Sequence, residues 1–284
     1  MEALQSASNS LDRALVILEL VEQVPGGLKN AEICRRLGIA TSSCSYILSR
    51  LEQRGYLTRD EEGRYQIGLT TLALAYGALR DMGFLDIAEP TLYGLANHTG
   101  LSASIGVLQR GRVLLIDRVE SPKFFRDAAE FGVYFASRRE NRQVVVSSGR
   151  MRRREQREIG RELPVHSNAL GKAMLAHLPR SEALEIIERE GLTPCTPHTI
   201  VSKSEFMAEL DQTKARGYAI SREEQYSGVY AVGVPFLDGM GIVRGAVSVN
   251  GSPSESIWDE ENLPDLVESV SIAARDISKR ARFR

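Results

Sequence analysis

Residues 41–55 read TSSCSYILSRLEQRG, and this stretch decides the fold of the first part of the chain. Its apolar residues recur at i, i+3, i+4 and i+7, which is the spacing of the buried face of an α-helix. The opposite face is small and polar and holds no long acidic side chain, and such a face suits a helix lying in the DNA major groove. The buried face comprises Cys44, Ile47, Leu48 and Leu51, and the polar face comprises Ser42, Tyr46, Ser49 and Gln53, flanked by Ser45 and Arg50.

Two helical patterns precede this segment, and each has a start or stop signal. A helix is expected over residues 10–22 with Ser10 as its N-cap, and the sequence VPGG at 24–27 ends it. A second helix is expected over 30–37, after which Gly38 supplies the left-handed turn that leads into the third helix. The residues expected to face the core from the first helix are Leu11, Ala14, Leu15, Leu18 and Val21.

A short pair of strands follows the third helix, which is expected to end at Gly55. Residues 56–58 and 65–67 are expected to be the strands, joined through a polar turn at 60–63. Three helices followed by such a pair predict a winged helix–turn–helix DNA-binding domain over residues 1–68. The alternative interpretation is a small helical bundle that packs without binding DNA.

The charge of the chain limits the ways in which it could use DNA. Its 284 residues carry 36 Lys and Arg against 37 Asp and Glu, which gives a net charge of −1. Residues 1–80 are neutral as well, with one Lys and eight Arg against nine acids. A protein that coats nucleic acid is expected to be strongly basic, so this balance argues against a structural DNA-binding protein. The DNA-binding prediction therefore rests on the helical pattern.

The remaining composition indicates a soluble globular protein with two domains. Hydrophobic residues make up 43% and charged residues 26% of the chain, and the N-terminal sequence has no signal-peptide pattern. No apolar run of about 18 residues is present, so no transmembrane helix is expected. Cys34, Cys44 and Cys195 are odd in number and far apart, which favours a reducing cytoplasm over a disulfide framework or a zinc site.

A helical stripe over residues 69–83 is expected to link the first domain to a second one over 84–284. A helix over 86–97 is expected to break near its start at Pro90. Strands and then groups of helices follow, which predicts an α+β fold with an antiparallel sheet and flanking helices. The expected strands are 102–107, 112–119, 218–221, 229–237 and 242–250, and the expected later helices are one from Asn168, 181–190, 202–217 and 259–282.

An arginine-rich segment lies in the middle of the chain. Residues 138–157 hold eight arginines against Glu140 and Glu155. The favoured interpretation is a solvated loop and helix face, partly disordered. The alternative is an auxiliary phosphate contact or a site for an anionic ligand.

The sequence contains no motif that predicts catalysis. GMGIVRG at 239–245 has one residue too many for a dinucleotide-binding fingerprint and lies in an expected hairpin. Gly171-Lys172 lacks the upstream glycine and the following Ser or Thr of a phosphate-binding loop. We therefore expect no enzyme activity and no cofactor.

Isolated titratable groups do not change this expectation. Neighbours on a strand point to opposite faces, so Glu223 and Glu224 are a poor pair for acid–base catalysis. His166, Cys195 and His198 match no standard zinc spacing, and no metal site is expected.

At four places the chain resembles the IclR family of bacterial transcriptional regulators, and together these places extend over nearly its whole length. The third and fourth are the most specific. The four stretches are NSLDRALVILELV (9–21), LEQRGYLTRD with RYQIG (51–60 and 64–68), GRELPVHSNALGKAMLA (160–176) and ARGYAISREEQYSGVYAVGVPFLDGMGIVRGAVSVNG (215–251).

The resemblance implies a cytoplasmic regulator with a winged helix–turn–helix, a linker helix and a C-terminal GAF/profilin-like effector domain. It implies a homodimer or a dimer of dimers on a double-stranded DNA operator, with no membrane partner. It also implies that a small-molecule effector, often an organic acid or an aromatic catabolite, modulates DNA binding, so the expected function is control of a catabolic operon. The alternative is a small-molecule-binding or enzymatic GAF-like protein whose N-terminal helical domain does not bind DNA.

The resemblance also identifies the helix from Thr41 as the recognition helix. Tyr46 stands where the family usually has a basic residue, and a tyrosine brings no charge to the DNA phosphates. Arg64 on the wing is expected to neutralise a phosphate, while side chains that reach base edges supply specificity. The residues expected to contact DNA are Ser42, Ser43, Ser45, Tyr46, Ser49, Arg50 and Arg64.

In the second domain the sheet and the helix at Gly171 are expected to frame an effector pocket. The N–H groups and the dipole at the start of that helix favour an anionic ligand group. Ser167 and Asn168 depart from the residues common at this place in the family, so the identity of the effector does not carry over. The residues expected to line the pocket are His166, Ser167, Asn168, Gly171, Tyr230, Ala231, Ser248 and Asn250.

Overall fold

The computed structural model describes residues 9–121, 160–281 and 283 of the chain. The chain divides into two compact units, Met1–Met82 and Gly83–Arg284, and each unit buries a hydrophobic core of its own. The arginine-rich residues 138–157 lie outside the described residues, so both interpretations of that segment stay predictions.

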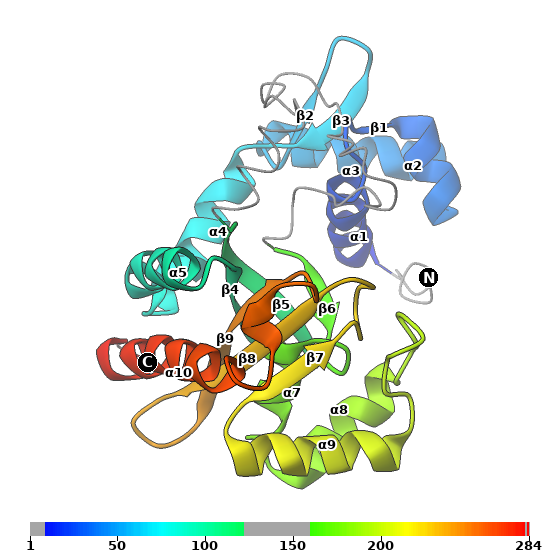
Figure 1. The fold of residues 1–284 in the computed structure, drawn as a ribbon. Helices are drawn as coiled ribbons and strands as arrows, with labels where there is room; N and C mark the ends of the chain where they lie inside the picture. Colours follow the sequence, from blue (N-terminus) through cyan, green and yellow to red (C-terminus); the bar gives the residue numbers. More distant parts are fainter. Residues whose placement is uncertain (1–8, 122–159, 282, 284) are drawn as a thin grey trace. The chain divides into compact units, whose positions relative to one another are not determined.

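The first unit packs three helices against a small sheet and continues into a fourth helix (Figure 1). The sheet is antiparallel with the strand order β1-β3-β2. The three predicted helices are confirmed, but β1 was not predicted, because a strand of two residues has no alternation to detect. The elements are α1 (Ser10–Glu22), β1 (Leu28–Lys29), α2 (Asn30–Leu37), α3 (Thr41–Gln53), β2 (Leu57–Arg59), β3 (Arg64–Ile67) and α4 (Thr70–Asp81).

The core of this unit forms around the apolar face of α3. Its four predicted residues are all buried, with Cys44 and Leu48 fully inaccessible to solvent. They pack against Ile17 of α1 and Ile33 of α2, which are also fully buried. This packing fixes the rotation of α3 and leaves its polar face exposed.

The predicted details of α1 are wrong at two points. Its N-cap is Asn9, whose Oδ1 accepts the backbone N–H groups of Leu11 and Asp12 at 2.9 Å each, and Ser10 is the first helical residue. Leu11 is 69% exposed and Leu15 is 50% exposed, although both were expected to face the core. The apolar surface of α1 is wider than the face that the unit can bury, and periodicity does not show which part is covered.

Gly27 explains why the turn after α1 needs a second glycine. Its φ of +77° lies in the left-handed region, and a Cβ there would lie 2.5 Å from the carbonyl oxygen of Tyr65 on β3. Glycine therefore lets the turn approach the wing strand closely. At the end of α2, Gly38 has a φ of +64° and provides the predicted left-handed turn.

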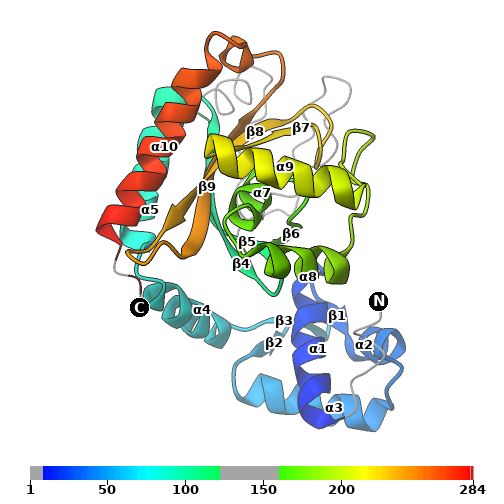
Figure 2. The ribbon, with the colours of Figure 1, turned by 90° about the horizontal axis from the view of Figure 1, so that it is seen from below.

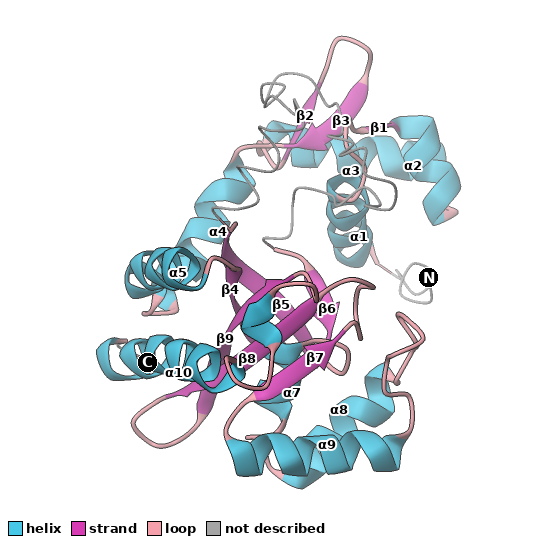
Figure 3. Ribbon diagram, in the orientation of Figure 1, coloured by secondary structure: helices cyan, strands magenta, loops and turns pink. Residues whose placement is uncertain are grey.

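Among the described residues of the second unit, six strands form one antiparallel sheet with the order β6-β5-β4-β9-β8-β7. Helices α5 and α10 cover one face, and α7 with α8 and α9 lies on the other (Figures 2 and 3). The elements are α5 (Leu85–Thr99), β4 (Ser102–Gln109), β5 (Arg112–Val119), β6 (Glu162–Pro164), α7 (Ala169–Leu175), α8 (Arg180–Glu190), α9 (Lys203–Arg216), β7 (Ala219–Arg222), β8 (Tyr230–Leu237), β9 (Val243–Gly251), η2 (Ser256–Trp258) and α10 (Leu263–Arg280).

Two helices of this unit differ from the prediction. Helix α5 runs without a break from Leu85 to Thr99 with Pro90 inside it. The proline removes one hydrogen bond near the helix start, and burial of Leu92 and the residues that follow on the same face offsets that loss. Helix α10 begins at Leu263, later than expected, because residues 259–262 form a turn after the short 3₁₀ helix η2.

The described ranges contain no helix with the length and apolar character needed to span a bilayer.

Candidate DNA-binding face and effector cavity

The exposed face of α3 presents most of the side chains that the sequence predicts to contact DNA. Ser42, Ser49 and Arg50 are exposed, Tyr46 is 61% exposed, and Ser43 is half-buried. Small hydroxyl groups of this kind allow the helix backbone to approach base edges closely.

Tyr46, Arg50 and Gln53 form a row along this face at i, i+4 and i+7. The guanidinium carbon of Arg50 lies 5.4 Å from the centre of the Tyr46 ring, and Nη1 of Arg50 donates to Oε1 of Gln53 at 3.2 Å. An arginine held over an aromatic ring loses less freedom when it binds a phosphate or a base. The ring of Tyr46 therefore holds the positive charge of Arg50 in place, one helical turn further along α3.

Ser45 faces α2 as well as the exposed surface. Its Oγ accepts a hydrogen bond from Nδ2 of Asn30 at 2.7 Å, and Oδ1 of Asn30 accepts one from Sγ of Cys34 at 3.1 Å. This chain of contacts joins α2 to α3 next to the core. Ser45 thus helps to set the angle between the two helices of the motif.

Arg64, the first residue of β3 after the wing turn, makes contacts within the unit. Its Nη1 donates to the carbonyl oxygen of Gly27 at 3.3 Å and lies 3.8 Å from Oε2 of Glu32. Oε2 of Glu32 also accepts the backbone N–H of Lys29 at 2.8 Å, and that hydrogen bond, helped by the charge of Arg64, lowers the pKa of Glu32. The side chain of Arg64 is 37% exposed, so part of the guanidinium faces solvent.

Cys44 and Cys195 differ in their surroundings. Burial raises the pKa of its thiol to about 12, whereas Cys195 in the second unit is exposed. We expect iodoacetamide at pH 8 to label Cys195 in the native protein while Cys44 stays unlabelled, because the thiolate is the reactive form. Mass spectrometry of peptides measures the labelling, with protein unfolded in guanidinium as the control that labels all three. Equal labelling rates of Cys44 and Cys195 in the native protein would contradict this prediction.

In the second unit a cavity of about 70 Å³ lies over the sheet beside the start of α7. Its floor is formed by paired residues of neighbouring strands. Ser104 of β4 pairs with Arg118 of β5 and with Ser248 of β9. Ala231 of β8 pairs with Ser221 of β7 and with Asn250 of β9. Apolar side chains of β5, β6 and α7 complete it. The lining residues are Ser104, Leu115, Arg118, Leu163, Asn168, Ala169, Leu170, Ser221, Gln225, Tyr226, Val229, Ala231, Ser248 and Asn250.

Arg118 brings a positive charge to this cavity and was not predicted. Its Nη1 donates to Oδ1 of Asn250 at 3.2 Å and to Oγ of Ser104 at 3.4 Å. Its Nε donates to Oε1 of Glu120 at 2.8 Å, and only 9% of its side chain is exposed. Its Nη2 also donates to Oε2 of Glu120 at 3.2 Å, so the guanidinium is paired with a carboxylate as well as lying among hydroxyl and amide groups. A polar group of a ligand would bind beside this pair.

Half of the residues expected to line the pocket do line the cavity, namely Asn168, Ala231, Ser248 and Asn250. The others lie elsewhere. Nε2 of His166 makes a 3.0 Å hydrogen bond with the carbonyl oxygen of Thr193, and burial lowers the pKa of its imidazole. Ser167 is fully buried, with its Oγ 3.6 Å from Sγ of Cys195. The ring of Tyr230 packs edge-on against Trp258 at 5.9 Å.

The start of α7 is shaped by Asn168 and Gly171. Oδ1 of Asn168 accepts the backbone N–H of Gly171 at 2.8 Å, so this N–H is already bonded inside the protein. A Cβ on Gly171 would lie 2.1 Å from the carbonyl oxygen of Val165, which explains the need for glycine there. The positive charge at the cavity comes from Arg118, and α7 with its seven residues mainly provides a wall.

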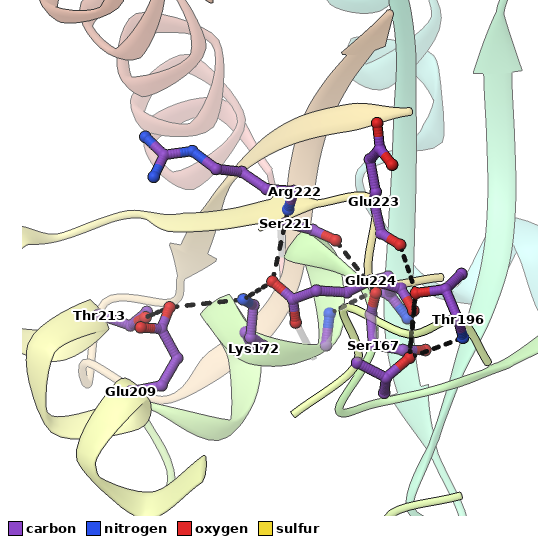
Figure 4. A network of polar contacts seen from close by, with 12 residues as sticks. Ser167, Lys172, Thr196, Glu209, Thr213, Ser221, Arg222, Glu223 and Glu224 are labelled. Atoms are coloured by element: carbon purple, nitrogen blue, oxygen red, sulfur yellow. Dashed lines mark hydrogen bonds and ion pairs between the residues drawn. The ribbon is translucent and has the colours of Figure 1, made fainter. Parts of the chain in front are cut away.

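Glu223 and Glu224 point in different directions (Figure 4). They lie in a bend after the end of β7, and not on a strand as expected from the sequence. Oε2 of Glu223 lies 3.6 Å from Nε2 of the exposed His198. Glu224 is buried, and its Oε1 accepts a hydrogen bond from Nζ of Lys172 at 2.6 Å. Burial raises the pKa of Glu224, while the Lys172 ammonium opposes the rise. In the part of the chain that the structure describes, no cluster of three His, Cys, Asp or Glu side chains could hold a metal ion.

Two sequence matches identify the protein family to which these two units correspond. Residues 10–61 match the IclR helix-turn-helix domain. Residues 127–279 match the C-terminal part of the bacterial transcriptional regulator IclR, and this match alone covers more than half of the chain. The chain belongs to the IclR family.

IclR relatives align with nearly the full chain. The glycerol operon regulatory protein of Streptomyces coelicolor is 31% identical in an alignment 279 residues long that covers 95% of this chain and 95% of that protein. The crystal structure of IclR from Thermotoga maritima is 26% identical with a TM-score of 0.69, covering 96% of this chain and 98% of that one. An IclR homologue from Microbacterium hydrocarbonoxydans, crystallised with 4-hydroxybenzoate, shares the fold with a TM-score of 0.74 at 20% identity, over 96% and 98% of the chains.

Membership in the IclR family confirms the resemblance seen in the sequence and the predicted α+β fold. The protein is a ligand-responsive transcriptional regulator with a helix–turn–helix DNA-binding domain. The exposed face of α3 and the cavity over the sheet are the candidate sites for those two activities.

Proposed function

We propose that this IclR-type regulator binds a twofold-symmetric operator as a homodimer or a dimer of dimers, and that a small organic acid bound over the sheet changes its DNA affinity. The observation that carries the proposal is the cavity with Arg118 in its wall. A chain with a recognition helix in one unit and a polar cavity in the other has both parts that a ligand-controlled regulator needs.

The dimer follows from apolar side chains that the single chain leaves exposed in the first unit. Leu11 and Leu15 of α1 are exposed, and α4 buries none of its residues, with Leu72 at 66% and Tyr76 at 68% exposure. Apolar helix faces of this kind are usually covered by a partner. A second copy would cover them, and it would also supply the second recognition helix that a symmetric operator requires.

On the DNA, α3 would lie in the major groove and the wing would contact the backbone. The hydroxyl groups of α3 would bond base edges or phosphates, Arg50 would bind a phosphate or a guanine, and Tyr46 would hold Arg50 in place. The exposed part of Arg64 would reach a phosphate beside the wing. The proposed contacts are Ser42, Ser43, Ser45, Tyr46, Ser49, Arg50 and Arg64.

In the cavity, the acid group of the effector would bind near Arg118, Ser248 and Asn250. The apolar side chains of the wall, such as Leu170, would contact the rest of the molecule. The cavity of about 70 Å³ is smaller than the ~150 Å³ that holds benzene in an engineered protein cavity. A short organic acid would therefore fit the space as it stands, and an aromatic acid such as the 4-hydroxybenzoate of the Microbacterium relative would have to widen it.

His166, Ser167, Gly171 and Tyr230 would act on the site through packing around the cavity. The relative from Streptomyces coelicolor is the regulator of a glycerol operon. We propose by analogy that this protein also controls a catabolic operon, whose substrate or product is the effector.

Selection of genomic fragments bound by the full chain tests this proposal. We expect enrichment of one or a few sites with inverted half-sites, and sedimentation of the complex at a mass of at least two chains. Acetate, propionate, benzoate and 4-hydroxybenzoate, each with its neutral amide as the control, are then titrated into the complex. No enriched site, or a monomer on the selected DNA, would contradict the proposed function.

A further inference from the structure

The effector unit contains a buried ion pair that neither DNA binding nor the lining of the cavity explains. Lys172 of α7 is 1% exposed and Glu224 is 6% exposed, and their Nζ and Oε1 atoms lie 2.6 Å apart (Figure 4). Oε1 of Glu209 on α9 lies 3.4 Å from the same Nζ and also accepts a hydrogen bond from Arg216 at 2.8 Å. Buried charges are costly to desolvate, so this cluster requires a reason beyond general stability.

The cluster is incompletely satisfied. Oε2 of Glu224 is buried and has no hydrogen-bond partner among the described residues. A polar network that served stability alone would be expected to satisfy both carboxylate oxygens or to be replaced by apolar packing.

Glu224 is also held through its backbone. Its carbonyl oxygen accepts a hydrogen bond from Oγ1 of Thr199 at 2.6 Å, and the carbonyl oxygen of Glu223 accepts one from Oγ1 of Thr196 at 2.6 Å. Glu223 itself has a φ of +59°, a left-handed conformation that is unfavourable for a residue with a side chain. The hydroxyl groups of residues 196–199 therefore hold two successive carbonyl groups of the chain at 223–224, in a conformation that it would not adopt freely.

This fixed point lies directly next to the cavity. Gln225, Tyr226 and Val229 follow Glu224 and line the cavity, while Asn168 and Leu170 line it from the start of α7, one turn before Lys172. The ion pair thus joins the two walls between which a ligand would bind.

We propose that Lys172 and Glu224 are positioning residues of the effector site, whose ion pair fixes the cavity-lining segment 225–229 against α7. The inference rests on the proposed function, because it assigns the cavity to an effector. Its consequence is that the pair sets the width of the cavity, and that the segment becomes mobile without the pair while the sheet remains intact.

Hydrogen–deuterium exchange of the ligand-free full chain tests this inference. In Lys172→Met we expect amides in residues 225–229 to exchange at least roughly tenfold faster, because this segment can then open without unfolding of the whole unit. The amides of β4 and β9 should keep their rates. Glu224→Gln is the second variant, since it keeps the shape of the side chain and removes only the charge. Lys172→Arg keeps the charge and should retain most of the protection.

The matched control is Arg180→Met, which breaks the exposed 2.6 Å pair between Arg180 and Asp211 on α8 and α9. It should leave exchange of 225–229 unchanged. Equally faster amide exchange in β4, β9 and residues 225–229 would show that the pair has a purely structural role. Unchanged exchange in both Lys172→Met and Glu224→Gln would show that it has no role. Either result overturns the inference. The exchange experiment uses no ligand, so its result does not depend on the DNA and acid titrations. Failure of the proposed function in those titrations is therefore distinguished from failure of this inference.

Discussion

Replacement of Arg50 with alanine is expected to weaken operator binding by roughly tenfold or more, because a base or phosphate contact of this kind contributes ~1–3 kcal/mol. If Arg50 neutralises one phosphate, the slope of log K against log salt should also fall by about one unit in magnitude. The free energy of unfolding should stay the same, since Arg50 is exposed and lies off the buried face of α3. Fluorescence anisotropy with the selected operator at several salt concentrations measures both quantities.

The matched control is Arg80→Ala, which removes the same charge from the same unit. Arg80 is on α4, its side chain is 70% exposed, and its Nε lies 3.6 Å from Asp81. We expect this variant to bind the operator almost as tightly as the wild type. An Arg50→Ala variant with unaltered affinity and unaltered salt slope would exclude a direct contact at this position.

The second large effect is expected from filling the cavity. Ala231 lies on β8 between Ser221 and Asn250 and lines the cavity, so a leucine there would occupy the space of the ligand. We expect Ala231→Leu to weaken binding of the tightest acid of the panel by on the order of a hundredfold, since pocket ligands depend on burying most of their surface. Operator affinity without the acid should change little. Calorimetry measures the first quantity and anisotropy the second.

Ala208→Leu provides the matched control for Ala231→Leu. Ala208 is exposed on α9 in the same unit, so the same added atoms would meet solvent. This variant should bind the acid like the wild type. If Ala231→Leu folds and still responds to the acid with wild-type affinity, the effector does not bind in this cavity.

The first unit was largely predictable because local signals agree with one another. The buried face of α3, the left-handed Gly38 and the strands of the wing all follow from spacing and turn residues. The inward face of α1 was not predictable, since its apolar residues extend around the helix and include Leu11 and Leu15. Which of them is covered depends on how the other elements pack on α1, and the sequence pattern of one helix does not contain that information.

The cavity was only half predictable, because its residues come together through strand register. Arg118 reaches it by pairing with Ser104, and the register shift opposite Ile105 and Gly106 leaves Ile116 unpaired and so changes the alternation within β5. Tyr230 and Ala231 were both expected to line the pocket, yet neighbours on a strand point to opposite faces, and only Ala231 does so. The contacts of Arg118 also span separations in sequence that a local pattern does not reveal.

The central claim is that one chain couples DNA binding to an acid bound in its second unit, and thermodynamic reciprocity tests it most directly. The affinity for the operator is measured with and without the tightest acid of the panel, and the affinity for that acid is measured with and without the operator. Because coupling between two sites is mutual, we predict that both affinities change by the same factor, in the range of roughly 5- to 150-fold. An acid that binds equally well to the free protein and to the operator complex would contradict the claim.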